Sequence, residues 1–168
     1  MDPKQSRFYV VDSKGCKVSA WSLTGQFLFN FESNTTVPLT FPMQAAVNSL
    51  GDIYVVHWGV KKVLVYGSDG KYKRSYGDEG AYAGQFMKPK GVAIDSDDNV
   101  YISDMATSAV QIFSSQDQMC LWIHQGINGA ARDLRIPLML AMDSQNRIFI
   151  PEYGNNRVQI WQYVKATK

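Results

Sequence analysis

The feature that most constrains this chain is an internal repeat. Four segments share one pattern of apolar and aromatic residues ending on a polar one: residues 8–12 (FYVVD), 53–57 (IYVVH), 100–104 (VYISD) and 148–152 (IFIPE). Their aromatic members are 45, 47 and 48 residues apart. A fixed period of this size is typical of repeat architectures, in which each unit is one supersecondary element covered by its neighbours.

The register inside each unit is stricter than the period. A valine follows six residues after the polar residue, and a large aromatic follows three residues later, in every unit: Val18 and Trp21, Val63 and Tyr66, Val110 and Phe113, Val158 and Trp161. Such agreement at fixed offsets is hard to obtain by chance, so we treat the repeat as established.

Each unit is predicted to contain four short strands, called a, b, c and d in chain order. The four segments above are the b strands, and the valine–aromatic runs belong to the c strands. Proline, which suits the first residue of a strand, opens the apolar run before b in three units, at Pro42, Pro89 and Pro137. Gly, Asn and Asp turns separate the strands, and no stretch has convincing helical periodicity.

The b strands are apolar on both faces, so their sheet needs a neighbour on each side. Four-stranded sheets of this length stacked radially make a β-propeller, whereas a sandwich or barrel would leave one face of strand b polar. We therefore predict an all-β fold and a single domain over residues 1–168. Its units lie at residues 1–31, 41–77, 88–123 and 136–163.

Composition excludes several other classes of protein. With 45% hydrophobic and 19% charged residues the chain reads as a folded domain, and a net charge of +2 is small for a general binder of nucleic-acid phosphates. No apolar run of about 18 residues could span a bilayer. The start of the chain has no apolar region typical of a secretory signal, which leaves the compartment unknown. With two cysteines and two histidines in no metal or haem pattern, no metal site and no cofactor are predicted.

The third unit resembles the NHL repeat. The resemblance is carried by residues 84–86 (GQF), 89–95 (PKGVAID), 99–104 (NVYISD) and 110–113 (VQIF), and by residues 155–161 (NNRVQIW) of the fourth unit. It covers nearly the whole chain, is most specific in the last two units, and points to bacterial NHL proteins. NHL propellers usually have six blades, which implies about 24 strands.

Only 14 strands can be counted: b to d in the first unit, a to d in the second and third, and a to c in the fourth. We therefore expect about four blades of a six-bladed ring, and so a fragment of a longer propeller. A closed four-bladed ring is the alternative. An open arc would expose Val and Ile faces at its ends, which predicts self-association or a second chain that completes the ring.

Function is expected on the loops that join b to c, because in a propeller they crowd one face around the channel. These loops cover residues 12–17, 57–62, 104–109 and 152–157. Asp12 with Lys17, and Glu152 with Arg157, are acid–base pairs suited to pinning the turn. The residues predicted to contact a partner are His57, Trp58, Lys62, Asp104, Tyr153 and Arg157. Packing on the next blade is the alternative role of Trp58 and Tyr153.

No base, nucleophile and metal cluster come together in the sequence, so we predict a non-catalytic protein–protein interaction scaffold, part of a larger bacterial assembly. The resemblance leaves two alternatives. NHL-containing lyases use a metal with histidine and tyrosine in the channel, and only His57 and Tyr153 could serve here. Other NHL domains bind single-stranded RNA on a basic loop face. The phosphate contacts would then be Lys14, Lys17, Lys61, Lys62 and Arg157. The low net charge and the acidic residues among them disfavour a nucleic acid as partner.

Overall fold

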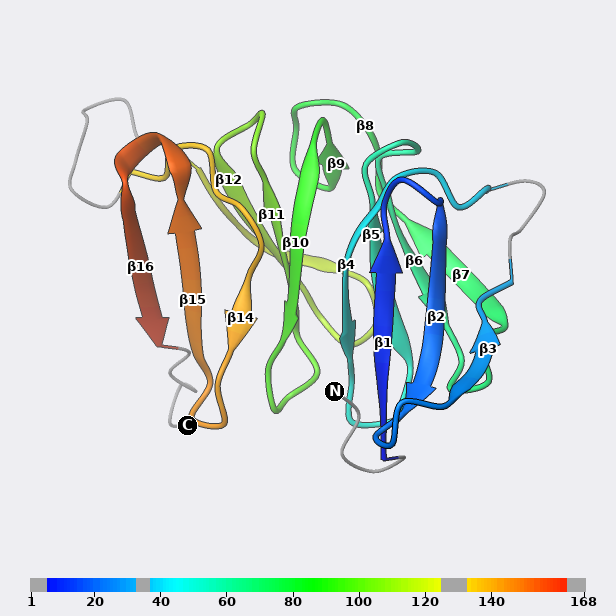
Figure 1. Ribbon diagram of the computed structural model, residues 1–168. Coiled ribbons are helices and arrows are strands. Elements are labelled where there is room, and N and C mark those ends of the chain that lie inside the picture. Colours follow the sequence, from blue (N-terminus) through cyan, green and yellow to red (C-terminus); the bar gives the residue numbers. More distant parts are fainter. Residues whose placement is uncertain (1–5, 33–36, 125–132, 163–168) are drawn as a thin grey trace.

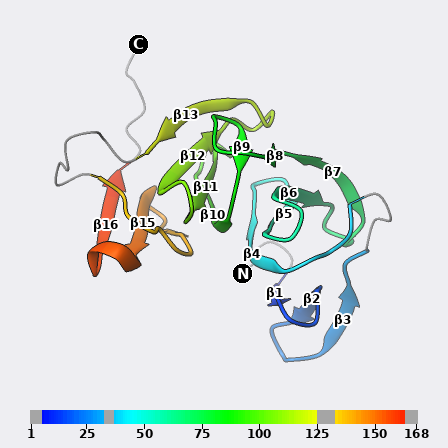
Figure 2. The ribbon, with the colours of Figure 1, turned by 90° about the horizontal axis from the view of Figure 1, so that it is seen from above.

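The computed structural model describes residues 6–32, 37–124 and 133–162, so the outermost ends of the first and fourth predicted units lie outside the described residues. Within them the chain forms four antiparallel sheets, here called blades 1 to 4, arranged in an open arc (Figures 1 and 2). No helix in the described part of the chain is long and apolar enough to cross a membrane.

The strands of each blade follow one another in chain order. Blade 1 contains β1 (Arg7–Asp12), β2 (Lys17–Ser22) and β3 (Phe27–Asn30). Blade 2 contains β4 (Pro42–Val47), β5 (Ile53–His57), β6 (Lys62–Tyr66) and β7 (Tyr72–Tyr76). Blade 3 contains β10 (Pro89–Ile94), β11 (Val100–Asp104), β12 (Ala109–Phe113) and β13 (Met119–Ile123). Blade 4 contains β14 (Ala141–Met142), β15 (Arg147–Glu152) and β16 (Arg157–Gln162).

The predicted all-β propeller architecture is confirmed, with the strands distributed over the blades as expected. Two further strands were not predicted: β8 (Asp78–Glu79) and β9 (Gln85–Phe86) pair in parallel in the connection between blades 2 and 3. The repeat could not reveal this pair, because the other connections between blades contain no segment of similar sequence. A ring of six blades stays a prediction.

The strand register explains the fixed offsets of the repeat. In every blade the polar residue that ends strand b pairs with the first residue of strand c, as in Asp12 with Lys17 and His57 with Lys62. Each b-to-c loop therefore has the same length and closes in the same way. The repeated valine and aromatic then fall on opposite faces of strand c.

Burial between blades is the reason that strand b is apolar on both faces. In β5, Ile53 and Val55 pack against blade 1, whereas Tyr54 and Val56 pack against blade 3. We call the side of a blade that covers the next blade its forward face and the opposite side its rear face. Three interfaces of this kind form the core, between blades 1 and 2, 2 and 3, and 3 and 4.

The first strand of blade 4 is shorter than its sequence indicates. The apolar run that opens at Pro137 pairs as a ladder only at Ala141–Met142, and Pro137 itself makes an isolated bridge with Glu152. The partner strand β15 has a proline at Pro151, which has no amide hydrogen to donate to the ladder, so only the Leu138 amide to Pro151 carbonyl bond forms there. The free backbone groups of the run find other partners. The carbonyl of Leu138 accepts a hydrogen bond from the Ser103 hydroxyl, and the amide and carbonyl of Leu140 are both bonded to Gln44.

Gln44 joins three blades through one side chain. It stands on β4, the inner strand of blade 2, and lines a hollow of about 320 Å³ between the inner strands. Its Oε1 accepts hydrogen bonds from the amides of Val92 (3.1 Å) in blade 3 and Leu140 (3.0 Å) in blade 4, and its Nε2 donates to the carbonyl of Leu140 (2.7 Å). One amide thus satisfies three backbone groups of two other blades.

Replacing Gln44 by leucine should lower the free energy of unfolding by about 2–4 kcal/mol, because it leaves these backbone groups without a partner. Urea denaturation followed by circular dichroism would measure the loss. The matched control is Gln116→Leu, in an exposed turn, which should change stability by less than about 0.5 kcal/mol. Equal effects of the two substitutions would contradict the bridging role.

Candidate interaction face

The four b-to-c loops gather at one end of the blades, together with β8 and β9 (Figure 1). We call this end the loop face. All six residues predicted to contact a partner come from its loops. The structure divides them into residues that hold the loops in shape and residues that remain available.

Asp104 is a structural residue at the end of β11. Its side chain is fully buried, and its carboxylate accepts four backbone hydrogen bonds. One oxygen is bonded to the amides of Met87 (2.7 Å) and Lys88 (2.9 Å), the other to those of Ala106 (2.9 Å) and Thr107 (3.1 Å). The carboxylate therefore fastens its own loop to the connection that enters blade 3, and it is not free to contact a partner.

Glu152 fastens the b-to-c loop of blade 4 in the same way, and it forms an ion pair with Arg157. Its carboxylate accepts hydrogen bonds from the Arg157 guanidinium (2.7 Å), the Asn155 and Gln159 amides, and the backbone of Arg135. Burial raises the pKa of Glu152, but these hydrogen bonds outweigh it and hold the pKa below its usual value. The predicted ion pair between Glu152 and Arg157 is therefore present across this turn, and it engages the Arg157 guanidinium within the loop.

His57 stands where the other blades have an acid. It is fully buried, and neither ring nitrogen makes a hydrogen bond of normal geometry, although the backbone of Thr40 lies close enough to favour the protonated ring slightly. Burial lowers the pKa of His57 to about 4, so the imidazole is neutral near pH 7. Blade 2 thus lacks the carboxylate that fastens the loops of blades 3 and 4, and its loop is held by backbone bonds from Trp58 to Phe41 and from Gly59 to Thr40 (both 3.1 Å).

Three lysines of the b-to-c loops are paired with acids. Lys62 donates to the carbonyl of Gly77 (2.6 Å) and to Asp78 (2.9 Å), and Lys61 lies 3.6 Å from Glu79. In blade 1, Lys17 lies 3.9 Å from Asp12. These ion pairs are exposed and add little stability, but they cancel local positive charge.

Trp58 lies at the centre of a different arrangement. The ammonium groups of Lys90 and Lys88 lie 4.9 Å and 5.9 Å from the centre of its ring, and the half-exposed ring of Phe41 lies 6.2 Å away. No salt bridge within the described part of the chain involves either lysine. We call these four residues the Trp58 cluster. It sits where blades 2 and 3 meet and combines exposed aromatic surface with two uncompensated positive charges.

Three members of the Trp58 cluster were missed in the sequence. Phe41, Lys88 and Lys90 belong to no b-to-c loop. The available signal was the pair of strand-opening prolines: Phe41 precedes Pro42, and the lysines flank Pro89. Because β4 and β10 are neighbouring inner strands, these prolines bring their flanking residues to the same end as Trp58.

Tyr153 is the most exposed of the predicted residues, at 71%, in the short 3-10 helix Tyr153–Asn155 of blade 4. It lines a shallow hollow with Leu138, Pro151 and Val158. His57 and Tyr153 belong to blades 2 and 4, which are not neighbours. Among the described residues, no three His, Cys, Asp or Glu side chains gather in a way that could hold a metal ion.

Comparison with known proteins identifies the repeat. The NHL repeat model matches residues 86–113. NHL repeat-containing protein 3 of Homo sapiens is 32% identical over 80 residues, which are 46% of this chain and 23% of the human protein. The chain thus spans about a quarter of the length of that relative.

Solved structures agree on the fold. A streptogramin B lyase superimposes with a TM-score of 0.69 at 15% identity, over 96% of this chain and 53% of the lyase. The WD40 β-propeller domain of Doa1 gives 0.69 at 12% identity, over 98% and 49%. A protein of unknown function from Bacteroides thetaiotaomicron gives 0.73 at 15% identity, over 96% and 46%. At these identities the similarity shows the fold alone, and the chain spans about half of each structure.

Replacing His57 by leucine should remove a pH dependence of stability. The unfolded chain binds a proton on His57 near pH 6.5 and the folded chain only near pH 4, so protonation favours unfolding between these values. The parent protein should lose up to about 3 kcal/mol relative to the variant as the pH falls from 6.5 to 4. Urea denaturation at several pH values measures the difference. His57→Gln, also neutral, should behave in the same way, and a difference that is constant with pH would contradict the prediction.

Replacing Asp104 by asparagine should lower the free energy of unfolding by about 2–4 kcal/mol, because the new NH₂ group faces two amide donors that then lack an acceptor. Thermal or urea denaturation would measure the change. Glu79→Gln, which alters an exposed carboxylate, is the control and should cost less than about 0.5 kcal/mol. Similar values for the two variants would show that Asp104 does not fasten the loop.

Proposed function

We propose that this chain, which belongs to the NHL-repeat family of β-propeller proteins, is a non-catalytic protein-interaction scaffold whose Trp58 cluster receives an acidic segment of a partner protein. The observation that carries the proposal is the pair of unpaired lysine ammoniums within 6 Å of a partly exposed indole. Tryptophan is enriched among the residues that dominate binding energy at protein interfaces.

The chemistry of the Trp58 cluster favours a carboxylate next to an apolar side chain. The indole and the Phe41 ring offer apolar surface, and the indole keeps Lys88 and Lys90 close through cation–π attraction. A carboxylate that approaches the lysines gains charge complementarity without competing against an ion pair inside the chain. Its neighbouring apolar or aromatic group can then cover the exposed rings.

Two observations favour a protein over RNA. Of the five residues predicted to contact phosphates, Lys17, Lys61, Lys62 and Arg157 are each paired with a carboxylate. In addition, the largely exposed acids Asp78 and Glu79 of β8 lie on the same face and would repel a continuous phosphate backbone. Little counterion release is therefore expected from this surface.

The positions of His57 and Tyr153 support a non-catalytic role. A lyase of the kind that the family resemblance suggested would need both side chains at one metal. His57 is buried inside blade 2, its nitrogens face no other titratable group within hydrogen-bonding distance, and Tyr153 belongs to blade 4. The similarity to streptogramin B lyase concerns the fold alone.

Trp58→Ala should weaken binding of an acidic aromatic peptide at least tenfold, because it removes the ring that the peptide covers and that holds the lysines in place. The probe is a fluorescein-labelled peptide of alternating Glu and Phe, followed by fluorescence anisotropy. Lys90→Ala should weaken binding by a similar factor, since a tenfold change corresponds to about 1.4 kcal/mol.

Two controls accompany this titration. Tyr153→Ala, an exposed aromatic on another blade, and Lys71→Ala, an exposed lysine in the turn before β7, should both bind like the parent protein. Single-stranded oligouridylate tests the nucleic-acid alternative. Tighter binding of the RNA than of the peptide, or equal peptide affinity for all four variants, would overturn the proposal.

A further inference from the structure

The b-to-c loop of blade 2 is fastened differently from those of blades 3 and 4. The buried Asp104 carboxylate is bonded to four amides, two in its own loop and two in the connection that enters blade 3. The Glu152 carboxylate accepts a hydrogen bond from the Arg135 amide in the connection that enters blade 4. His57 takes the equivalent place in blade 2, and its imidazole makes no hydrogen bond of normal geometry. An uncharged ring thus stands where the two following blades have a buried anion.

Two backbone hydrogen bonds hold the blade 2 loop to the connection that enters the blade. The amide of Trp58 donates to the carbonyl of Phe41, and the amide of Gly59 donates to that of Thr40 (both 3.1 Å). Trp58 and Phe41 are also two members of the Trp58 cluster. The lysines of the cluster belong to blade 3. Breaking these two bonds would therefore separate the two rings and free the indole to leave the lysines.

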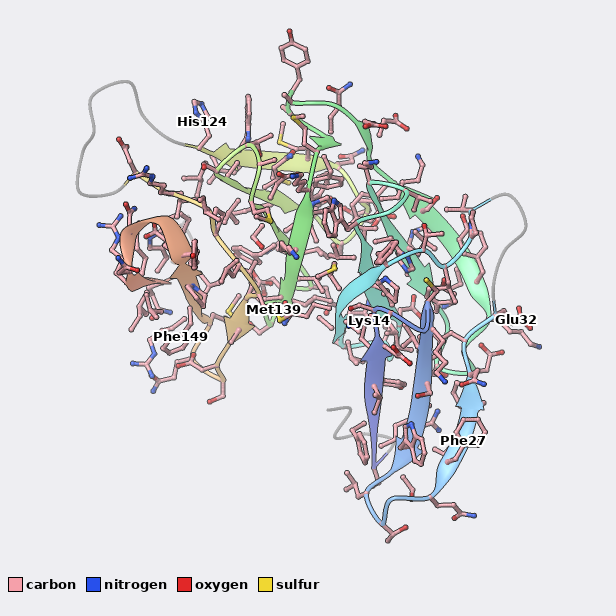
Figure 3. The ribbon with its side chains drawn as sticks, turned by 45° about the horizontal axis from the view of Figure 1, so that its top comes forward. Lys14, Phe27, Glu32, His124, Met139 and Phe149 are labelled. Carbon is pink, nitrogen blue, oxygen red and sulfur yellow. The ribbon has the colours of Figure 1, made fainter. Side chains whose placement is uncertain are left out.

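The imidazole of His57 lies on the rear face of blade 2. It follows Ile53 and Val55 at the spacing of a strand, and both of these pack against blade 1. The b-to-c loop of blade 1 reaches this place, because the Ser13 hydroxyl donates to the carbonyl of Pro42 (2.6 Å), the ladder partner of His57. Figure 3 shows Lys14 on this loop.

No acid is available to neutralise a protonated His57. The titratable side chains on the surrounding elements are Asp12, Lys14, Cys16 and Lys17 of the blade 1 loop, Lys61 of its own loop, Lys62 of β6, and Lys88 and Lys90 beside Trp58. Asp12 is engaged by the amide of Gly15 (2.7 Å) and by Lys17 (3.9 Å). Burial lowers the pKa of His57 and the backbone of Thr40 opposes this, and no charged side chain contributes. A positive charge on this ring would therefore be buried without a counter-charge.

We propose that His57 makes the Trp58 cluster sensitive to acid: protonation of its imidazole opens the b-to-c loop of blade 2 and takes the cluster apart. The imidazolium reaches water only when the amide bonds of Trp58 and Gly59 break, so proton uptake and loop opening are one event. As a control of partner binding the inference rests on the proposed function, but the opening itself needs no partner.

The size of the effect follows from the two protonation states. In the closed loop the pKa of His57 is about 4, and in the open loop the exposed ring regains its ordinary value of 6.5. Because the open loop binds the proton more tightly, a fall in pH between these values favours opening. The ratio of open to closed loop should be about twentyfold larger at pH 5 than at pH 7.

Amide hydrogen exchange followed by NMR at pH 5 and pH 7, corrected for the pH dependence of intrinsic exchange, tests the inference. The protection factors of the Trp58 and Gly59 amides should fall about twentyfold at pH 5. The internal control is the amide of Met105. Its bond to the carbonyl of Lys88 (3.1 Å) is the blade 3 counterpart of the Trp58 bond, in a loop fastened by Asp104, so its protection should not change.

Replacement of the imidazole provides the matched variants. His57→Gln and His57→Leu do not titrate, so the protection of the Trp58 and Gly59 amides should be the same at pH 5 and pH 7 in both. Circular dichroism checks that each variant is folded, and either variant alone suffices. Three results would overturn the inference: equal protection at both pH values in the parent protein, an equal loss at Met105, which would indicate global unfolding, or the same loss in the variants.

The acidic aromatic peptide separates this inference from the proposed function. Its glutamates are still largely ionised at pH 5, and it should restore protection of the Trp58 and Gly59 amides there, because it binds only the assembled cluster. If acid opens the loop and the peptide changes nothing, the inference stands and the proposed function fails. If Trp58→Ala weakens peptide binding but acid does not open the loop, the proposed function stands and the inference fails.

Discussion

The architecture depends on burying strand b from both sides. A single blade of this chain cannot cover its own apolar faces, so each blade depends on packing against its neighbours. This requirement fixes the arc and its order, and it brings the loops of all blades to one end. The proposed interaction surface follows from it, because the Trp58 cluster forms only where blades 2 and 3 pack together and residues of both blades meet.

The sequence predicted the fold well because the constraint is periodic. Val18, Val63, Val110 and Val158 recur at one offset, so strand number, order and register could be read from spacing. Irregular features were not accessible in this way. The β8–β9 pair occurs in one connection only, and the shortening of β14 goes with a single substitution in the repeat, Pro151 of β15, which lacks the amide hydrogen that the ladder needs.

The candidate site was predicted less well, for a physical reason. Departure from the repeat drew attention to the loop at His57 and Trp58, but spacing does not distinguish a buried side chain from an exposed one. Asp104 and His57 lie at the same position of their loops and both are inside the protein, but Asp104 is bonded to four amides whereas His57 makes no hydrogen bond of normal geometry. Lys88 and Lys90 join the Trp58 cluster through packing between blades, for which the only local sign was their position beside the strand-opening Pro89.

The hydrogen bonds of Gln44 have a consequence for how the blades fold together. Repeat proteins are usually described by the intrinsic stability of each unit and the coupling to its nearest neighbours. Gln44 adds a coupling between second neighbours, because a side chain of blade 2 holds the backbone of blade 4. Loss of blade 4 would then weaken blade 2 directly, and blades 2 to 4 form one cooperative unit rather than a row of independent links.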